Sequence, residues 1–321
     1  MDIYRLKNQK NKDFFGECYL RKNVFDYLRN SWANSWPMIM IMFFEFAIGI
    51  TDVYIAGKIS KEVQASIGYV SQLYFILIVL GNAFTMGVVA VASRLFTSDR
   101  ESFYRLIYTA VFSVMIVSII LSIIAFILLP YFLKIISPPK QLQTYIEPLM
   151  MIYIFILPFH YILVITNGIL RSSKRLKHSM LTMASVCVLN IGTNILYVFY
   201  LGVGFKGLVL STLTAVVIGA LLNLFYLRKE VLKIKIYDKQ LLKRAVSIGW
   251  PSSLVQVGWQ LASIVIYMLI SSLPEKNTEF MAAFTNGIRI ESIIFLPSFA
   301  FSMANAVIVG NLLGEKKYDE A

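Results

Sequence analysis

Charged residues are scarce in this sequence, since Asp, Glu, Lys and Arg make up only 15% of its 321 residues. Soluble domains of similar size usually carry about 25%. Hydrophobic residues reach 58%, and the mean hydropathy is +0.69. Because so much apolar surface cannot be enclosed in one soluble core, the composition excludes an ordinary soluble domain and indicates a protein that contacts lipid.

Acidic residues are the scarcer of the two signs, which leaves a formal net charge of +12. A strongly basic chain can indicate a nucleic-acid partner. Here, however, the Lys and Arg residues lie between long apolar runs. We therefore interpret them as charges that flank membrane spans, and we expect no nucleic-acid partner.

Cysteine and histidine are also rare, with two of each. Cys18 and Cys187 lie far apart, which excludes a disulfide framework, and the histidines share no ligand-like spacing. The sequence lacks a phosphate-binding glycine loop with Lys, a zinc-binding HExxH motif and a nucleophile GxSxG motif. We predict that the protein is not an enzyme and holds neither a metal nor an organic cofactor.

Apolar runs, by contrast, are long and numerous. A helix needs about 20 mostly apolar residues to cross a bilayer, and eight stretches qualify: 36–56, 67–92, 106–133, 148–170, 180–200, 207–227, 248–273 and 280–309. They are continuous rather than alternating, which favours helices over a β-barrel. The sequence therefore predicts an all-α polytopic membrane protein.

The positive charges predict the orientation of these spans. Most of the 30 Lys and Arg residues fall in the N-terminal segment and in the loops after the second, fourth and sixth spans. Such loops lie on the cytoplasmic side. We expect a multi-pass protein of the inner membrane, surrounded by membrane lipid, with a cytoplasmic N-terminus.

An internal repeat relates the first and seventh spans. Trp36-Pro37 opens one and Trp250-Pro251 opens the other, and 84–86 (FTM) in the second span matches 301–303 (FSM) in the eighth. Both copies run in the same direction, which is typical of transporters that place a cavity between two lobes. The alternative is that duplication merely extends a helix bundle.

The repeat predicts four regions. These are a cytoplasmic segment 1–35, a six-helix N-terminal lobe 36–230, a cytoplasmic linker 231–246, and the first helix pair of a second lobe over 247–321. A complete second lobe would need four more helices, so we expect this one to be incomplete.

Several short motifs resemble those of the multidrug and toxic compound extrusion (MATE) family. They are 51–57 (TDVYIAG) after Pro37, 170–174 (LRSSK), 190–194 (NIGTN), 204–207 (GFKG) and 309–314 (VGNLLG). The resemblance covers residues 30–321 and implies a two-lobed antiporter. Such proteins exchange protons or sodium ions for cationic or amphipathic drugs.

Asp52 is the leading candidate for binding the coupling ion. A charged side chain inside a membrane span is energetically costly, so it is expected to have a function. The resemblance also places an aspartate in the first helix. The alternative is that Asp52 caps the helix or faces water. Glu45 lies seven residues earlier on the same helix face and is a candidate for binding a cationic substrate; pairing with a neighbouring helix explains it equally well.

Amides provide candidate partners for Asp52. Asn190 and Asn194 are four residues apart, so they share one face of the fifth span. The resemblance implies that Asn167 and Thr212 complete a cation-coupling site. The alternative is that these side chains only join helices. Some proton-coupled relatives have a carboxylate where Asn194 stands, which leaves the choice between protons and sodium ions open.

The seventh span departs from the family. Its sodium-linked branch has a glutamate eight residues after the helix proline, and this sequence has Trp259 there, flanked by Gln256 and Gln260. These three are candidate substrate-binding residues, with Trp259 able to stack on an aromatic cation. Packing against other helices explains Trp259 as well.

The function that we expect is secondary antiport of a small cationic or amphipathic molecule. A first alternative is flipping of a lipid-linked saccharide, which would need a cationic cavity. A second is a non-transporting, truncated membrane protein. The sequence does not predict an oligomeric state.

Overall fold

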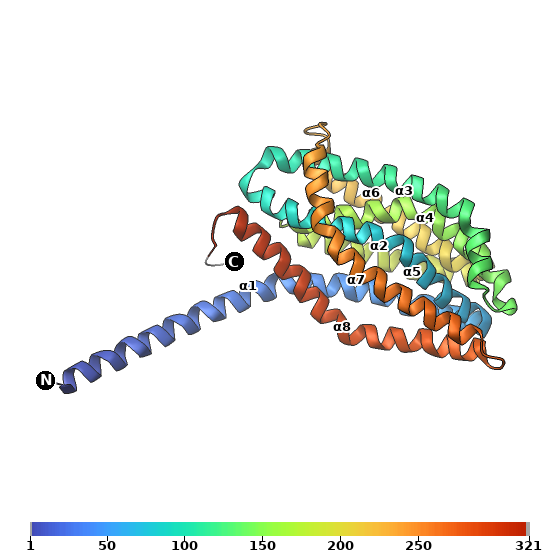
Figure 1. The fold of residues 1–321 in the computed structure, drawn as a ribbon, viewed down its shortest axis with the longest axis horizontal. Helices are drawn as coiled ribbons and strands as arrows, with labels where there is room; N and C mark the ends of the chain where they lie inside the picture. The colour runs from blue at the N-terminus through green and yellow to red at the C-terminus, as the bar shows by residue number, and fades with distance from the viewer. Residues whose placement is uncertain (1, 319–321) are drawn as a thin grey trace.

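A computed structural model shows a bundle of long helices (Figure 1). It describes the backbone of residues 2–318 and the side chains of most residues from 29 to 318, leaving out those of 30, 34, 252, 253, 260, 289, 292, 293 and 296. Most of the predicted segment 1–35 therefore lies outside the described side chains. The helices are α1 (Asp2–Ile59), α2 (Lys61–Ser98), α3 (Arg100–Ile136), α4 (Lys140–Ser172), α5 (Leu176–Ile195), α6 (Lys206–Val231), α7 (Lys239–Ser271) and α8 (Asn277–Gly314).

The eight predicted spans are confirmed. Among the described residues, each of the eight helices contains a stretch long and apolar enough to cross a membrane. The helices extend beyond the predicted spans because polar caps continue them into the loops. Ser60 accepts a hydrogen bond from the amide of Val63 at 3.2 Å and begins α2, and Asp99 accepts from the amides of Glu101 and Ser102 and begins α3.

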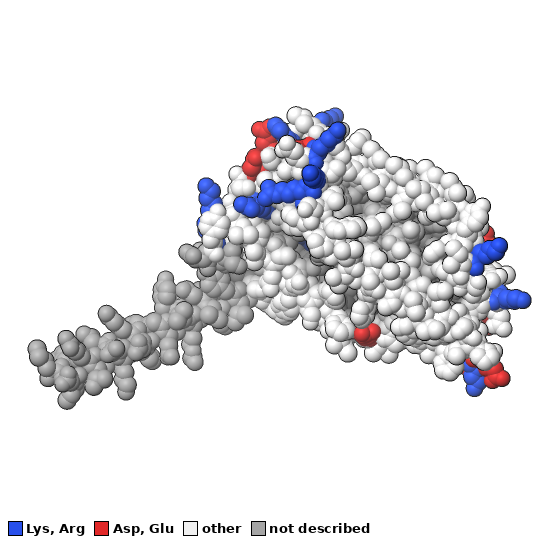
Figure 2. All heavy atoms as spheres, viewed as in Figure 1, with Lys and Arg blue, Asp and Glu red and all other residues white. Residues whose placement is uncertain are grey.

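Helices α2 and α4 form the centre of the bundle. Helix α2 packs against α4, α7 and α8, while α4 also packs against α3 and α6. Helix α3 is the most apolar span, yet only 11% of its most apolar stretch is buried. It therefore presents its side chains to lipid. Figure 2 shows the charged residues gathered at the two ends of the bundle, with a nearly uncharged belt between them.

The packing of the four repeated helices follows the predicted repeat. Helix α1 packs against α8, and the equivalent helices α7 and α2 pack against each other. The second contact is very close: a Cβ atom added to Gly87 would lie 1.8 Å from the carbonyl oxygen of Ala245, and one added to Gly249 would lie 2.2 Å from that of Ala83. Such small residues let membrane helices approach closely.

Helices α2 and α8 meet through equivalent positions. The register that aligns Phe84 with Phe301 also aligns Gly68 with Thr285 and Ser93 with Gly310, and both of these pairs are in contact. Contact between a residue and its own equivalent is what a two-fold axis between the helices requires. The axis runs along this helix pair. Helix α8 changes direction along its length (Figure 1), and it contains Pro297, a residue that bends helices, between the two contacts.

Candidate functional site

Asp52 lies inside the N-terminal lobe, about two turns before α1 ends, and only 8% of its surface is exposed. Its Oδ1 atom accepts a hydrogen bond from Nδ2 of Asn194 at 2.6 Å. The alternative that Asp52 faces water is therefore wrong. A buried carboxylate held by an amide donor remains in the apolar part of the lobe.

Asn194 uses all of its amide atoms. Nδ2 donates to Asp52 and also to Oδ1 of Asn190 at 3.1 Å, while Oδ1 accepts from Oγ of Ser211 at 2.7 Å. This pattern fixes the orientation of the amide, so that its N–H groups face the carboxylate. The prediction that Asn190 and Asn194 share a face of α5 is confirmed.

Thr212 extends the network to α6. Its Oγ1 atom accepts a hydrogen bond from Nδ2 of Asn190 at 3.2 Å. Immediately after Asn194, α5 changes into a π-helical turn over Leu196–Tyr200; such turns are frequent at functional sites. The neighbouring Ser211 was not predicted, although a second hydroxyl beside Thr212 in an apolar helix is a signal that could have identified it.

We refer to Asp52, Asn190, Asn194, Ser211 and Thr212 as the Asp52 cluster. It joins α1, α5 and α6 through one buried carboxylate and neutral oxygen and amide groups. A carboxylate in such surroundings can take up a proton, and carboxylate, amide and hydroxyl oxygens also suit a hard cation. The geometry is compatible with either coupling ion.

Asn167 takes part in a different network, which corrects the prediction that it completes the site around Asp52. Its Oδ1 atom accepts from Ser179 at 2.9 Å and from Asn223 at 3.0 Å, and its Nδ2 atom contacts the sulfur of Met183 at 3.2 Å. Asn223 also accepts from Thr182 at 2.8 Å. Asn167 points toward α5 and α6 near the connection between α4 and α5, and polar partners from those helices satisfy it there.

Arg171 is buried, although the sequence indicated a charge in a cytoplasmic loop. It lies within α4 and is 8% exposed. Its guanidinium turns back along the helix toward Gly168, and it interacts electrostatically with Glu45 of α1. The apolar run alone could not show this, because α4 continues beyond its end through Arg171 to Ser172. Glu45 itself is exposed.

The structure describes the side chains of two of the three candidates of α7. Gln256 contacts the sulfur of Met86 at 3.4 Å, while Trp259 is 68% exposed. The side chain of Gln260 lies outside the described residues. Their role in binding substrate stays a prediction.

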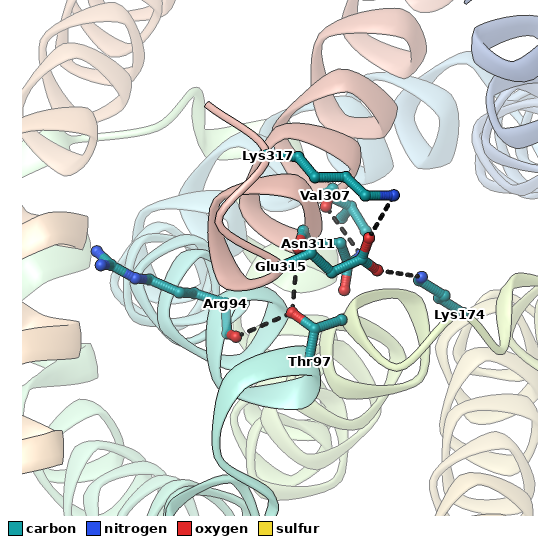
Figure 3. A network of polar contacts seen from close by, with 7 residues as sticks. All are labelled: Arg94, Thr97, Lys174, Val307, Asn311, Glu315 and Lys317. Carbon is teal, nitrogen blue, oxygen red and sulfur yellow. Dashed lines mark hydrogen bonds and ion pairs between the residues drawn. The ribbon is translucent and has the colours of Figure 1, made fainter. Parts of the chain in front are cut away.

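A polar network joins α8 to the N-terminal lobe at the basic end of the bundle (Figure 3). Nζ of Lys174 lies 3.3 Å from the Glu315 carboxylate, and Lys317 lies 3.2 Å from its other oxygen. Oγ1 of Thr97 donates to the carbonyl oxygens of Asn311 at 3.1 Å and Arg94 at 3.2 Å. Thr97 also contacts Gly314, its equivalent in the repeat. These contacts hold α2 and α8 together along the two-fold axis at this end of the bundle.

Comparison with known proteins gives one family model and several similar chains. The family model, described as MatE, matches residues 37–196 and 251–321. The "Uncharacterized transporter YisQ" of Bacillus subtilis is 22% identical over 89% of this chain and 65% of its own length. The "Probable multidrug resistance protein NorM" of Thermotoga maritima is 23% identical over 85% of this chain and 61% of its own.

Solved structures have the same fold. A structure of the MATE multidrug transporter DinF-BH superposes with a TM-score of 0.82, at 22% identity, over 90% of this chain and 66% of that one. This chain therefore spans about two thirds of the length of the proteins that it resembles.

Proposed function

Since the chain belongs to the MatE family, we propose that it takes part in secondary transport and exports small cationic or amphipathic molecules in exchange for protons or sodium ions. The family match confirms the resemblance seen in the sequence. It also supports transport rather than catalysis. We place this multi-pass protein in the inner membrane, with the end that carries Lys174 and Lys317 toward the cytoplasm.

The observation that carries the proposal is the buried Asp52 cluster. One carboxylate lies inside a lobe, at hydrogen-bond distance from an amide whose other atoms are all engaged. Binding of a proton or a sodium ion changes the charge of this site, and the change acts directly on α1, α5 and α6. Asp52 thus links ion binding to the packing of the lobe.

The contacts along the two-fold axis support movement between the lobes. At the end away from the basic loops, Gly68 packs on Thr285, and Thr285 hydrogen-bonds Tyr267 at 2.9 Å. At the basic end, Ser93 packs on Gly310 and Lys174 pairs with Glu315. Access from either side requires that one of these contact zones opens while the other stays closed.

Export from vesicles tests the proposal. Vesicles that contain the 321-residue chain are loaded with a cationic dye, and dye efflux is followed after a pH jump and after a sodium jump. We expect Asp52→Asn to abolish gradient-driven efflux, because the amide can neither bind a proton nor balance a sodium ion. Glu147→Gln removes an exposed carboxylate and serves as the matched control. Equal efflux from both variants would contradict the proposal. Because an incomplete second lobe can leave the unaltered chain without efflux, sodium binding is measured in the same variants, and equal sodium binding together with equal proton release would also contradict it.

Arg171 favours a second candidate, transport of an anionic molecule such as a lipid-linked saccharide pyrophosphate. A buried guanidinium is an effective partner for phosphate. However, Glu45 already offers an opposite charge to Arg171. For this reason we rank export of cations first.

A further inference from the structure

A cavity of about 170 Å³ lies at the basic end of the N-terminal lobe, away from the Asp52 cluster. Four helices or their connections surround it, and its lining residues are Phe96, Arg100, Phe103, Tyr104, Ser173, Arg175, Leu227 and Glu230. Three of these side chains are aromatic, two are guanidinium groups and one is a carboxylate. The cavity therefore combines apolar ring faces with positive charge.

Of the charged side chains that line the cavity or lie near it, some are paired and others are not. Nη2 of Arg175 donates to Oε1 of Glu230 at 2.5 Å, so these two neutralise each other. Arg100 instead lies over the ring of Phe96, 3.7 Å from its centroid, and nearby Lys233 lies 4.3 Å from the ring of Tyr104. Among the described residues no acidic group pairs with either cation, so positive charge remains for an anion.

The cavity also keeps an unsatisfied acceptor. Oε2 of Glu230 is buried and has no hydrogen-bond partner among the described residues. Such an atom in a native protein calls for an explanation, and a bound water or ligand is the usual one. A ligand that carries both an anionic group and a donor, such as a hydroxyl, would satisfy Arg100 and Glu230 together.

The surroundings point to a lipid rather than to a free anion. Arg100 and Tyr104 lie in the first turns of α3, and exposed apolar residues continue the Tyr104 side of this helix, including Met115, Ile119 and Phe126. A headgroup in the cavity would leave its acyl chains beside this face. Basic pockets between membrane helices on the cytoplasmic side are typical binding sites for anionic headgroups.

We propose that this cavity binds the headgroup of an anionic phospholipid that carries free hydroxyls, such as phosphatidylglycerol, with its phosphate at Arg100 and a hydroxyl at Glu230. The acyl chains lie along α3. This site is separate from the Asp52 cluster, and it does not depend on the coupling ion.

Native mass spectrometry of the purified chain tests the site, with phosphatidylglycerol and phosphatidylcholine as probes. We expect bound phosphatidylglycerol to exceed phosphatidylcholine, and Arg100→Gln to weaken phosphatidylglycerol binding about fivefold. Arg228→Gln is the matched control, because Arg228 also stacks on a ring, that of Phe225 at 4.0 Å, but does not line the cavity. Its affinity should change less than twofold.

Three outcomes would overturn the proposal. The first is equal binding of both lipids by the unaltered chain. The second is an equal loss in both arginine variants, which would indicate unspecific attraction to a basic surface. The third is displacement of phosphatidylglycerol by millimolar inorganic phosphate, which would indicate an anion site without a lipid. Size-exclusion chromatography of Arg100→Gln checks that the variant is folded, as its exposed position predicts.

Discussion

The Oδ1 atom of Asp52 lies 2.6 Å from the Nδ2 atom of Asn194, although 142 residues separate the two in the chain. The contact joins α1, which also packs on α8, to α5, which packs on α6. A change in the charge of the carboxylate therefore acts on the packing inside the N-terminal lobe and also on α1, the helix that contacts α8 of the second lobe. This connection makes Asn194 the residue through which the cluster can be tested without removing its charge.

Replacing Asn194 by Leu should destabilise the protein by about 2 kcal/mol, because three hydrogen bonds inside a membrane contribute roughly 0.6 kcal/mol each. The substitution also leaves the carboxylate of Asp52 without its amide donor. Thermal unfolding in detergent measures the loss. Ser185→Ala is the control, since Ser185 is partly exposed and, among the described residues, its hydroxyl bonds to the carbonyl oxygen of Leu181 in its own helix. If both variants unfold at the same temperature, the Asp52 cluster contributes nothing to stability.

Most of the fold could be predicted from the sequence, because the apolar runs are long and the bilayer fixes the length that they need. The repeat was visible for a similar reason: Trp36-Pro37 and Trp250-Pro251 open equivalent helices. The helix ends could not be predicted well. They depend on caps such as Ser60 and Asp99, which lie outside the apolar runs.

The Asp52 cluster was predicted in part. The spacing of Asn190 and Asn194 gives their common face, because helical periodicity is local. Asn167 was assigned to the wrong network, because the direction of a side chain between three helices depends on their packing. Arg171 was missed for the same reason: a cation at the end of an apolar run resembles a flanking charge, and only the packing of α4 shows that it turns inward.

The contact between α2 and α7 predicts a sharp difference between two glycines. Gly87→Ala should destabilise the protein by about 1–3 kcal/mol, because the new Cβ atom would lie 1.8 Å from the backbone oxygen of Ala245 and force the helices apart. Gly192→Ala should leave stability unchanged or raise it by up to about 1 kcal/mol, since nothing lies within 4 Å of its added Cβ atom and alanine favours a helix. Thermal unfolding of both variants checks this, and a similar shift in both would contradict the close contact.

Arg171 distinguishes the two candidate substrates. If the protein exports cations, Arg171→Gln should leave the binding of a cationic dye unchanged or make it tighter, because a positive charge has been removed. A site for an anionic pyrophosphate should instead lose at least about tenfold in affinity. Quenching of tryptophan fluorescence measures both affinities, and Lys177→Gln, which removes an exposed cation from the first turn of α5, is the control. Weaker dye binding in Arg171→Gln alone would count against export of cations.

The ion pair between Lys174 and Glu315 is expected to keep α2 and α8 in contact at the basic end of the bundle (Figure 3). In a chain with Cys18 and Cys187 replaced by Ser, a cysteine introduced at buried position Ser93 reports access to the interface with Gly310. Glu315→Gln should raise its rate of labelling by a water-soluble maleimide about two- to fivefold, the range expected for a partly exposed ion pair.

Acidification should have the same effect as this substitution, but only at low pH. Hydrogen bonds from Lys317 and then Lys174 lower the pKa of the Glu315 carboxyl below its ordinary value of 4.5. A lowered pKa means that the pair stabilises the closed end at all pH values above the ordinary pKa and that this contribution is lost as the pH falls through the lowered one. Labelling should therefore stay constant from about pH 8 to 5 once corrected for the reactivity of the thiol, and rise only below pH 4.5.

Lys61→Gln is the control. It removes the 3.8 Å pair with Glu279 at the opposite end of the bundle and should not change the rate of labelling. A rise between pH 7 and 5, or an equal rise in Lys61→Gln, would show that Glu315 does not hold this end closed.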